Sequence, residues 1–120
     1  MPPTPVDQLP LTIPVFQILL SLVDGPLHGY AIIHDVARRT DDDVRLTAST
    51  LYGAVARMLE AGLIDEREPP AGLERRRMYA ISRLGRTLLA AEARRLSRAA
   101  GWARDKQVLA PATPKRRGRV

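Results

Sequence analysis

The 120-residue chain contains no cysteine, which excludes disulfide bonds and thiolate metal sites. No apolar run approaches the ~20 residues that a membrane-spanning helix needs. The first twelve residues show no basic region followed by an apolar core, so we expect no secretory signal peptide. These absences favour a cytoplasmic protein that makes no use of a membrane and is held together by a hydrophobic core.

The residues that catalysis usually needs are also scarce. There are only two histidines, His28 and His34, and their spacing of six does not put them on one helical face. No glycine loop of a nucleotide-binding type is present. The spacing of the remaining polar residues also indicates no nucleophile–base pair. Three successive carboxylates at residues 41–43 point in different directions and indicate an acidic loop. We therefore expect no enzyme, no cofactor and no bound metal.

The positive charge is unevenly distributed. The net charge is +6, and four of these charges come from the last six residues, at Lys115, Arg116, Arg117 and Arg119. In the rest of the chain, the densest basic cluster is at residues 75–77. A basic balance permits a polyanionic partner, but the position of the charge says more than its total.

The stretch from Thr47 to Gly62 organises the remaining sequence. Thr47 is a suitable N-cap and Gly62 a suitable residue for the end of a helix. Leu51, Val55 and Met58 recur at helical spacing and form one apolar stripe, with Leu59 beside them. The opposite face is mostly small and could lie close against a large partner; its members are Ser49, Gly53, Ala56, Arg57 and Glu60.

Two helices are expected before this stretch and a hairpin after it. Residues 15–23 are almost all apolar and indicate a buried helix, and residues 29–39 indicate a second with Tyr30, Ile33 and Val36 at core spacing. Residues 44–46 are either a short strand or the lead-in to the third helix. Residues 63–68 and 77–82 predict two strands separated by a proline-rich break, with Tyr79 and Ile81 facing inward. Three helices and a hairpin in this order predict a winged helix-turn-helix.

A long helix is expected at residues 84–108, although Gly101 could kink it or end it early. Its apolar stripe covers nearly half of its circumference over ~37 Å, more than a small domain can cover. We therefore expect its distal half, together with the first helix, to form the interface of a two-fold dimer. The expected interface residues are Phe16, Leu20, Leu88, Leu96, Ala99 and Trp102.

The predicted fold class is mainly α with a small β-hairpin, a winged helix-turn-helix plus a long C-terminal dimerisation helix. The expected organisation is a flexible arm at 1–11, a DNA-binding domain at 12–82, the dimerisation helix at 83–108 and a basic disordered tail at 109–120.

The third helix supplies the first set of expected DNA contacts. Thr47, Ser49 and Thr50 can donate hydroxyl hydrogen bonds to phosphates at the positive end of the helix dipole. Arg57 is the outward residue able to contact guanine in bidentate fashion, but it could equally pair with Glu60 or hold a phosphate. The N-terminal half of the helix would enter the major groove.

Further contacts are expected from neighbouring elements. Tyr52 is a candidate phosphate donor, with core packing as an equal alternative, and Tyr30 either packs in the core or reaches a phosphate. His28 and Gly29 could offer backbone N–H groups at the start of the second helix. The hairpin would lie along the minor groove or the backbone through its arginines, unless these only keep a strand edge solvated; they are Arg75, Arg76 and Arg77.

These segments together resemble the PadR family of bacterial transcriptional regulators. The similar segments are residues 18–20 (ILL), 24–30 (DGPLHGY), 49–52 (STLY), 59–64 (LEAGLI), 75–79 (RRRMY) and 84–86 (LGR). They occur in order between about residues 12 and 105. The chain differs from the usual family pattern at Ser49, where glycine is common, and at Met78.

The resemblance implies a sequence-specific DNA-binding regulator of the short-chain branch that dimerises through its C-terminal helix. It also implies repression that is released by a small molecule or a stress signal. Some family members stack flat aromatic molecules on this helix, so Trp102 is a candidate effector-binding residue, with interface packing as the alternative. A dimer should recognise a pseudo-palindromic operator in double-stranded DNA, with half-sites ~34 Å apart. The alternatives are a winged-helix module that binds protein or RNA, and a MarR-like regulator of different topology.

Overall fold

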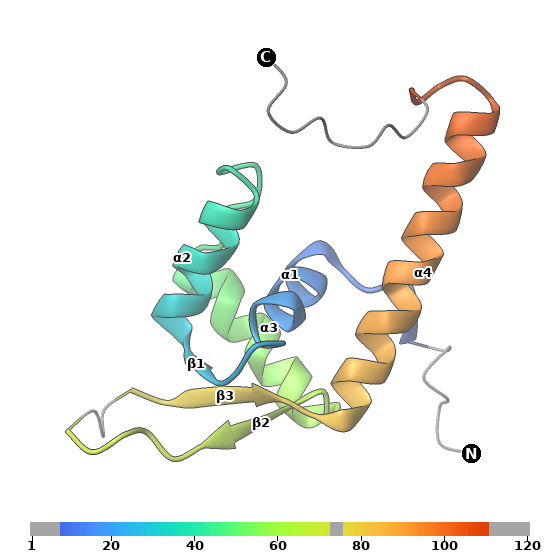
Figure 1. Ribbon diagram of the computed structural model, residues 1–120. Coiled ribbons are helices and arrows are strands. Elements are labelled where there is room, and N and C mark those ends of the chain that lie inside the picture. Colours follow the sequence, from blue (N-terminus) through green and yellow to red (C-terminus); the bar gives the residue numbers. More distant parts are fainter. Residues whose placement is uncertain (1–7, 73–75, 111–120) are drawn as a thin grey trace.

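The computed structural model describes residues 8–72 and 76–110, and Figure 1 shows the helices and strands within these ranges. The helices are α1 (Ile13–Ser21), α2 (Gly29–Arg39), α3 (Ala48–Glu60) and α4 (Arg83–Asp105). The strands are β1 (Leu27–His28), β2 (Ile64–Arg67) and β3 (Met78–Ile81). No helix in these ranges is long and apolar enough to cross a membrane.

Local capping explains where the helices begin and end. Thr12 caps α1 by accepting the N–H of Val15 at 3.3 Å, and Ser82 caps α4 by accepting the N–H of Gly85 at 3.0 Å. Thr47 is the N-cap of α3, and Gly62 follows its last turn with a φ of +78°. The predicted ends of the third helix are therefore confirmed.

The three strands form one antiparallel sheet in the order β1-β3-β2. Ile64 pairs with Ile81 and Arg67 with Met78, which confirms the predicted hairpin. The third strand, β1, was not predicted; its Leu27 pairs with Tyr79. Residues 44–46 form no strand and lead into α3.

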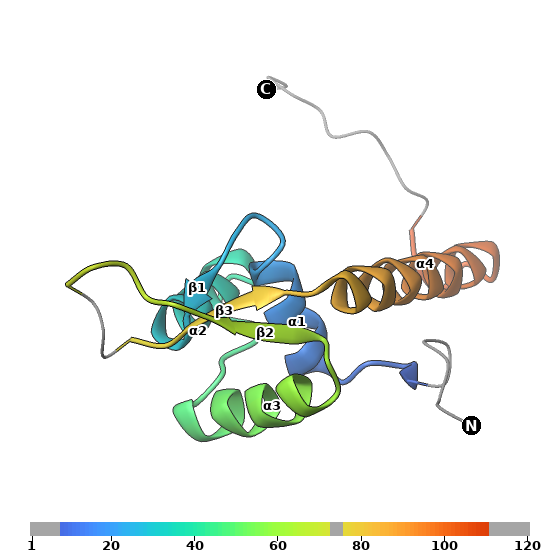
Figure 2. The same ribbon diagram turned by 90° about the horizontal axis from the view of Figure 1, so that it is seen from below.

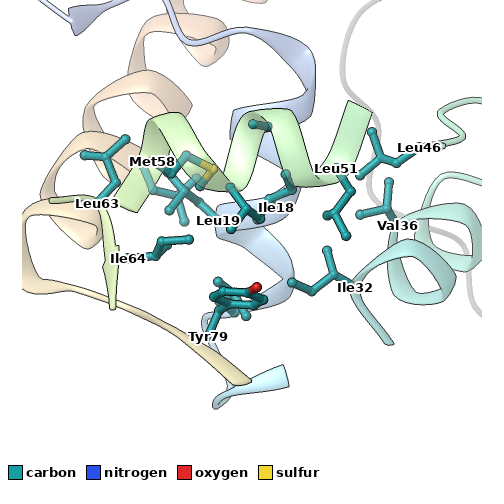
Figure 3. Packing of buried hydrophobic residues seen from close by; sticks show 14 of the residues in the cluster. Ile18, Leu19, Ile32, Val36, Leu46, Leu51, Met58, Leu63, Ile64 and Tyr79 are labelled. Carbon is teal, nitrogen blue, oxygen red and sulfur yellow. The ribbon is translucent and has the colours of Figure 1, made fainter. Parts of the chain in front are cut away.

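The core lies where α1, α2 and α3 meet the sheet, as Figure 3 shows. Ile32 and Val36 orient α2 because both are fully buried. The prediction that Tyr30 lies at core spacing is wrong, because the phase set by these two residues leaves Tyr30 64% exposed. Tyr79 is buried as predicted, and Ile81 packs against the core.

Helix α4 starts in the core and then leaves it (Figure 1). Its buried residues end at Glu92, although the helix continues for three more turns. Leu88 was predicted at a dimer interface, but this is wrong because Leu88 is fully buried inside its own chain. Gly101 does not end the helix, which runs on to Asp105.

The segment before α1 belongs to the folded domain. Leu9 and Leu11 pack against the core, so the prediction of a flexible arm through residue 11 is wrong for residues 8–11. The rest of that predicted arm, and residues 111–120 of the predicted tail, lie outside the described residues.

Candidate nucleic-acid interface

The start of α3 presents hydroxyl groups to solvent. The N–H of Thr50 donates to Thr47 Oγ1 at 3.1 Å, and the Thr47 hydroxyl donates to Thr50 Oγ1 at 3.0 Å. The Thr47 hydroxyl is thus committed to the cap, whereas the Thr50 proton remains available to an outside acceptor. Ser49 is exposed beside them. This end of α3 can therefore donate to an anion, aided by the helix dipole.

Gly53 lies in the middle of the outward face of α3, and its own chain does not require a glycine there. A Cβ at residue 53 would find only Arg57 Nη1 within 4 Å, at 3.7 Å. Two other glycines are needed for packing: a Cβ at Gly29 would lie 2.5 Å from the Tyr52 hydroxyl, and one at Gly85 would collide with the Leu63 carbonyl oxygen. A glycine inside a helix costs ~1 kcal/mol relative to alanine, and Gly53 leaves this face of α3 open to close approach from outside the chain.

Arg57 lies along this same face. It is exposed, and its guanidinium reaches back towards Gly53, one turn nearer the N-terminal end of α3. It also borders a small pocket of about 180 Å³ between α3 and residues 8–12. Because no ion pair with Glu60 is found, its hydrogen-bond donors are available to a partner.

A polar pocket of about 340 Å³ lies where α2, α3 and β3 meet. Its lining comes from the end of β1, the start of α2, α3, β3 and the two residues before β3, namely His28, Gly29, Tyr30, Tyr52, Arg76, Arg77 and Tyr79. Burial raises the pKa of Tyr79, so its phenol stays protonated at neutral pH. Among the residues that the structure describes, the lining includes two arginines and no acid, which makes it a suitable site for an anion.

His28 makes two contacts that a single neutral ring cannot satisfy together. Its Nδ1 accepts the N–H of Ala31 at 3.2 Å and thereby caps α2. The ring proton must then be on Nε2, which faces the Nη1 donor of Arg76 at 3.1 Å. Partial burial, and then the charge of Arg76, hold the pKa of His28 below its ordinary value. An oxygen that accepted from both donors would resolve this conflict.

The remaining predicted site residues differ in their surroundings. Tyr52 is 50% exposed and its hydroxyl reaches over Gly29, so it lies at the pocket and outside the core. Arg77 makes a long ion pair with Glu66 on β2, with 3.7 Å between Nε and Oε2. Tyr30 contacts His34 edge-to-face, with 4.7 Å between ring centroids. Arg75 lies outside the described residues.

Two features of this surface were missed from the sequence. The pairing of β1 with β3 brings His28 next to the arginines of the hairpin, and a two-residue strand has no recognisable periodicity. Glu92 was not singled out from the sequence, and it is a buried, paired carboxylate. The arginine three residues after it, Arg95, was the available signal.

The lowered pKa of His28 makes stability depend on pH. Between that pKa and the ordinary value of 6.5 the unfolded chain binds more protons, so stability falls as pH falls through this range. In urea unfolding at about pH 7.5 and about pH 5.5, His28→Asn should lose less stability on acidification than the unchanged chain, because asparagine caps the helix without titrating. His34→Asn is the control and should keep the full loss. An equal loss in His28→Asn would contradict this account.

Comparisons with known proteins identify the family of this chain. The model of the transcriptional regulator PadR-like family matches residues 18–91. A protein from Streptomyces fradiae, described as an uncharacterized 37.1 kDa protein in transposon TN4556, is 38% identical over 84 residues. That match covers 70% of this chain but 23% of the relative, so this chain spans about a quarter of its length.

Solved structures share the fold. A transcriptional regulator from Clostridium thermocellum is 21% identical, with a TM-score of 0.66 over 82% of this chain and 93% of that chain. A PadR family transcription regulator from Clostridium difficile is 20% identical, with a TM-score of 0.68 over 82% of this chain and all of that chain. Together with the family match over more than half of its length, these findings show that the chain belongs to the PadR-like family of transcriptional regulators.

Proposed function

We propose that this regulator binds double-stranded DNA with the N-terminal half of α3 in the major groove. The observation that carries the proposal is the outward face of α3, where Gly53 has no packing role in its own chain. Ser49 and Ala56 beside it are also small and exposed. A surface without large side chains lets the helix backbone approach base edges closely.

The pocket between α2, α3 and β3 would hold a backbone phosphate. Tyr52, Arg76 and the Nε2–H of His28 supply donors, and the N-terminus of α2 adds its dipole. A phosphate oxygen between His28 and Arg76 would accept from both and remove their donor–donor conflict. Contacts of this kind fix the position of a protein on DNA without reading its sequence.

Sequence would be read by the exposed polar side chains of α3. Arg57 is the candidate for a bidentate contact with guanine, and Ser49 and Thr50 are suited to shorter hydrogen bonds. Arg77 would lie along the sugar–phosphate backbone or the minor groove of the DNA. We propose the same for Arg75, which lies two residues earlier in the sequence.

We further propose that the protein acts as a homodimer through the part of α4 that leaves the domain. Leu96 is 41% exposed and Trp102 64% exposed, and Ala99 lies on the same side of the helix. Phe16 and Leu20 on α1 are only partly buried and complete the proposed interface. A two-fold dimer would present two α3 helices to a pseudo-palindromic operator.

The proposed role is repression released by a small molecule or a stress signal. Trp102 is the candidate contact for a flat aromatic effector, because most of its ring is accessible in the single chain. Repression of this kind acts in the compartment that holds the DNA, which in a bacterium is the cytoplasm.

Salt dependence of binding tests the phosphate pocket. Arg76→Ala should weaken binding to all duplexes and reduce the slope of log affinity against log salt by up to ~0.9, the value for one lost phosphate contact. Fluorescence anisotropy with a labelled duplex from upstream of the protein's own gene measures it. Arg38→Ala is the matched control, because it also removes one guanidinium charge, but at the C-terminal end of α2, away from the pocket. It should leave the slope unchanged. An unchanged slope in Arg76→Ala would reject the pocket as a phosphate site, and no DNA binding at low salt would favour a protein or RNA partner.

Sedimentation equilibrium tests the dimer. The unchanged chain should be dimeric at micromolar concentration, and Leu96→Glu should make it monomeric by placing a charge in an apolar interface. Ser97→Glu introduces the same charge on the neighbouring, exposed residue, which is on the other side of α4, and should remain dimeric. Circular dichroism checks that both variants stay helical. If the unchanged chain is monomeric at micromolar concentration, the proposed dimer is contradicted.

A further inference from the structure

Glu92 is a buried carboxylate at the point where α4 leaves the domain. Only 2% of it is exposed, and it is the last buried residue on the helix. Its Oε1 accepts from Arg95 Nε at 2.6 Å and its Oε2 from Arg95 Nη2 at 2.9 Å. The pair with Arg95 lowers the pKa of Glu92 despite its burial, so the group is ionised at neutral pH.

The same carboxylate also holds the segment that precedes α1. Its Oε2 accepts the backbone N–H of Leu11 at 3.1 Å, across 81 residues of sequence. The segment packs against the core through Leu9 and Leu11, and its residues 8 and 10–12 border the small pocket beside α3. Residues 8–12 thus lie between α3 and α4, and Glu92 fixes them to α4.

A buried charge is an energetically costly way to hold two elements of a fold together. Burying a carboxylate costs free energy that its pairs offset only when their geometry is good, and an apolar side chain of similar size is often at least as stable. Glu92 lies next to Leu88 and Leu89 on the buried face, where another apolar residue would continue the stripe. Hydrogen bonds to a backbone N–H and to a guanidinium impose a direction that apolar contact does not.

We propose that Glu92 is a positioning residue that fixes the angle at which α4 leaves the DNA-binding domain, by tying the helix to the backbone of Leu11. Beyond Glu92 no residue of α4 is buried. A small rotation of the helix about this point therefore displaces its distal end by a large distance. Resting on the dimer proposed above, this angle sets the separation of the two α3 helices. Glu92 would therefore determine which half-site spacing the protein accepts.

The distance between the domain and the distal part of α4 tests the angle without DNA. Because the chain has no cysteine, Arg38→Cys and Arg98→Cys provide two specific sites for spin labels on α2 and α4. Dilution with unlabelled chain leaves only distances within one protomer. We expect one narrow distance distribution when residue 92 is unchanged and a broadened or shifted distribution in Glu92→Leu. The distribution should be narrow again in Glu92→Gln, because its amide oxygen can still accept the N–H of Leu11. Arg95→Met combined with Glu92→Gln leaves no unpaired buried charge and keeps the Leu11 contact, so its distribution should also be narrow.

The outcomes separate positioning from general stability. Glu92→Leu should unfold at no lower urea concentration than the unchanged chain, although its spin-label distance distribution broadens. If Glu92→Leu does not fold, Glu92→Met takes its place, because methionine has a more adaptable side chain. An unchanged distribution in the apolar variant would overturn the proposal. So would equal broadening in Glu92→Gln accompanied by loss of stability, which is the signature of a merely structural role.

Binding to operators of altered spacing tests the consequence. The unchanged chain should lose about 10²-fold in affinity when the half-sites are moved by a few base pairs, because both cannot then be engaged together. Glu92→Leu should bind a single half-site as tightly as the unchanged chain but discriminate less among spacings. Parallel loss at half-sites and full sites would overturn the link to spacing. If no variant binds DNA, the proposed function fails, and the spin-label distances still decide the role of Glu92.

Discussion

Leu51, Val55 and Met58 are packed into the core with at most 3% of each residue exposed, and this packing fixes the rotation of α3. Figure 3 shows Leu51 and Met58 in the core. Once that face is committed, Ser49, Gly53 and Ala56 have to point away from the core. Figure 2 shows α3 at one side of the molecule, next to the sheet. The outward orientation of the proposed binding surface is thus a consequence of core packing, and its small side chains are the feature that core packing leaves unexplained.

A second set of contacts brings the hairpin to the same region. The Ser82 hydroxyl donates to the Gly62 carbonyl at 2.6 Å, and the Ser82 N–H donates to the Leu63 carbonyl at 3.0 Å. The end of α3, the return of β3 and the start of α4 are therefore held together at one junction. Pairing of β1 with β3 then places His28 within 3.1 Å of Arg76, which assembles the proposed phosphate pocket from three distant parts of the chain.

Features encoded by neighbouring residues could be predicted, and features that depend on distant contacts could not. Thr47 and Gly62 mark the ends of α3 through local capping, so that helix followed from the sequence. Tyr30 was misplaced because α2 is short and its periodicity fits two phases; packing of Ile32 and Val36 selects one. Leu88 was misassigned for a related reason: an apolar stripe on α4 does not reveal where the domain ends and a partner would begin. The proposed DNA contacts could be chosen by residue type, but the pocket that groups His28, Tyr52 and Arg76 required the folded chain.

The most direct test of the DNA-binding surface is to measure stability and DNA affinity together in variants of Gly53. Gly53→Ala should raise the free energy of unfolding by up to ~1 kcal/mol, since its Cβ meets no close neighbour, and should weaken binding to the operator; Gly53→Leu should weaken it by about tenfold or more, ~1.4 kcal/mol. Ser97→Ala, on the side of α4 away from the proposed dimer interface, is the control; it should also raise helix stability and should leave affinity unchanged. If the Gly53 variants gain stability and bind DNA as tightly as the unchanged chain, nothing approaches α3 at that position and the account is contradicted.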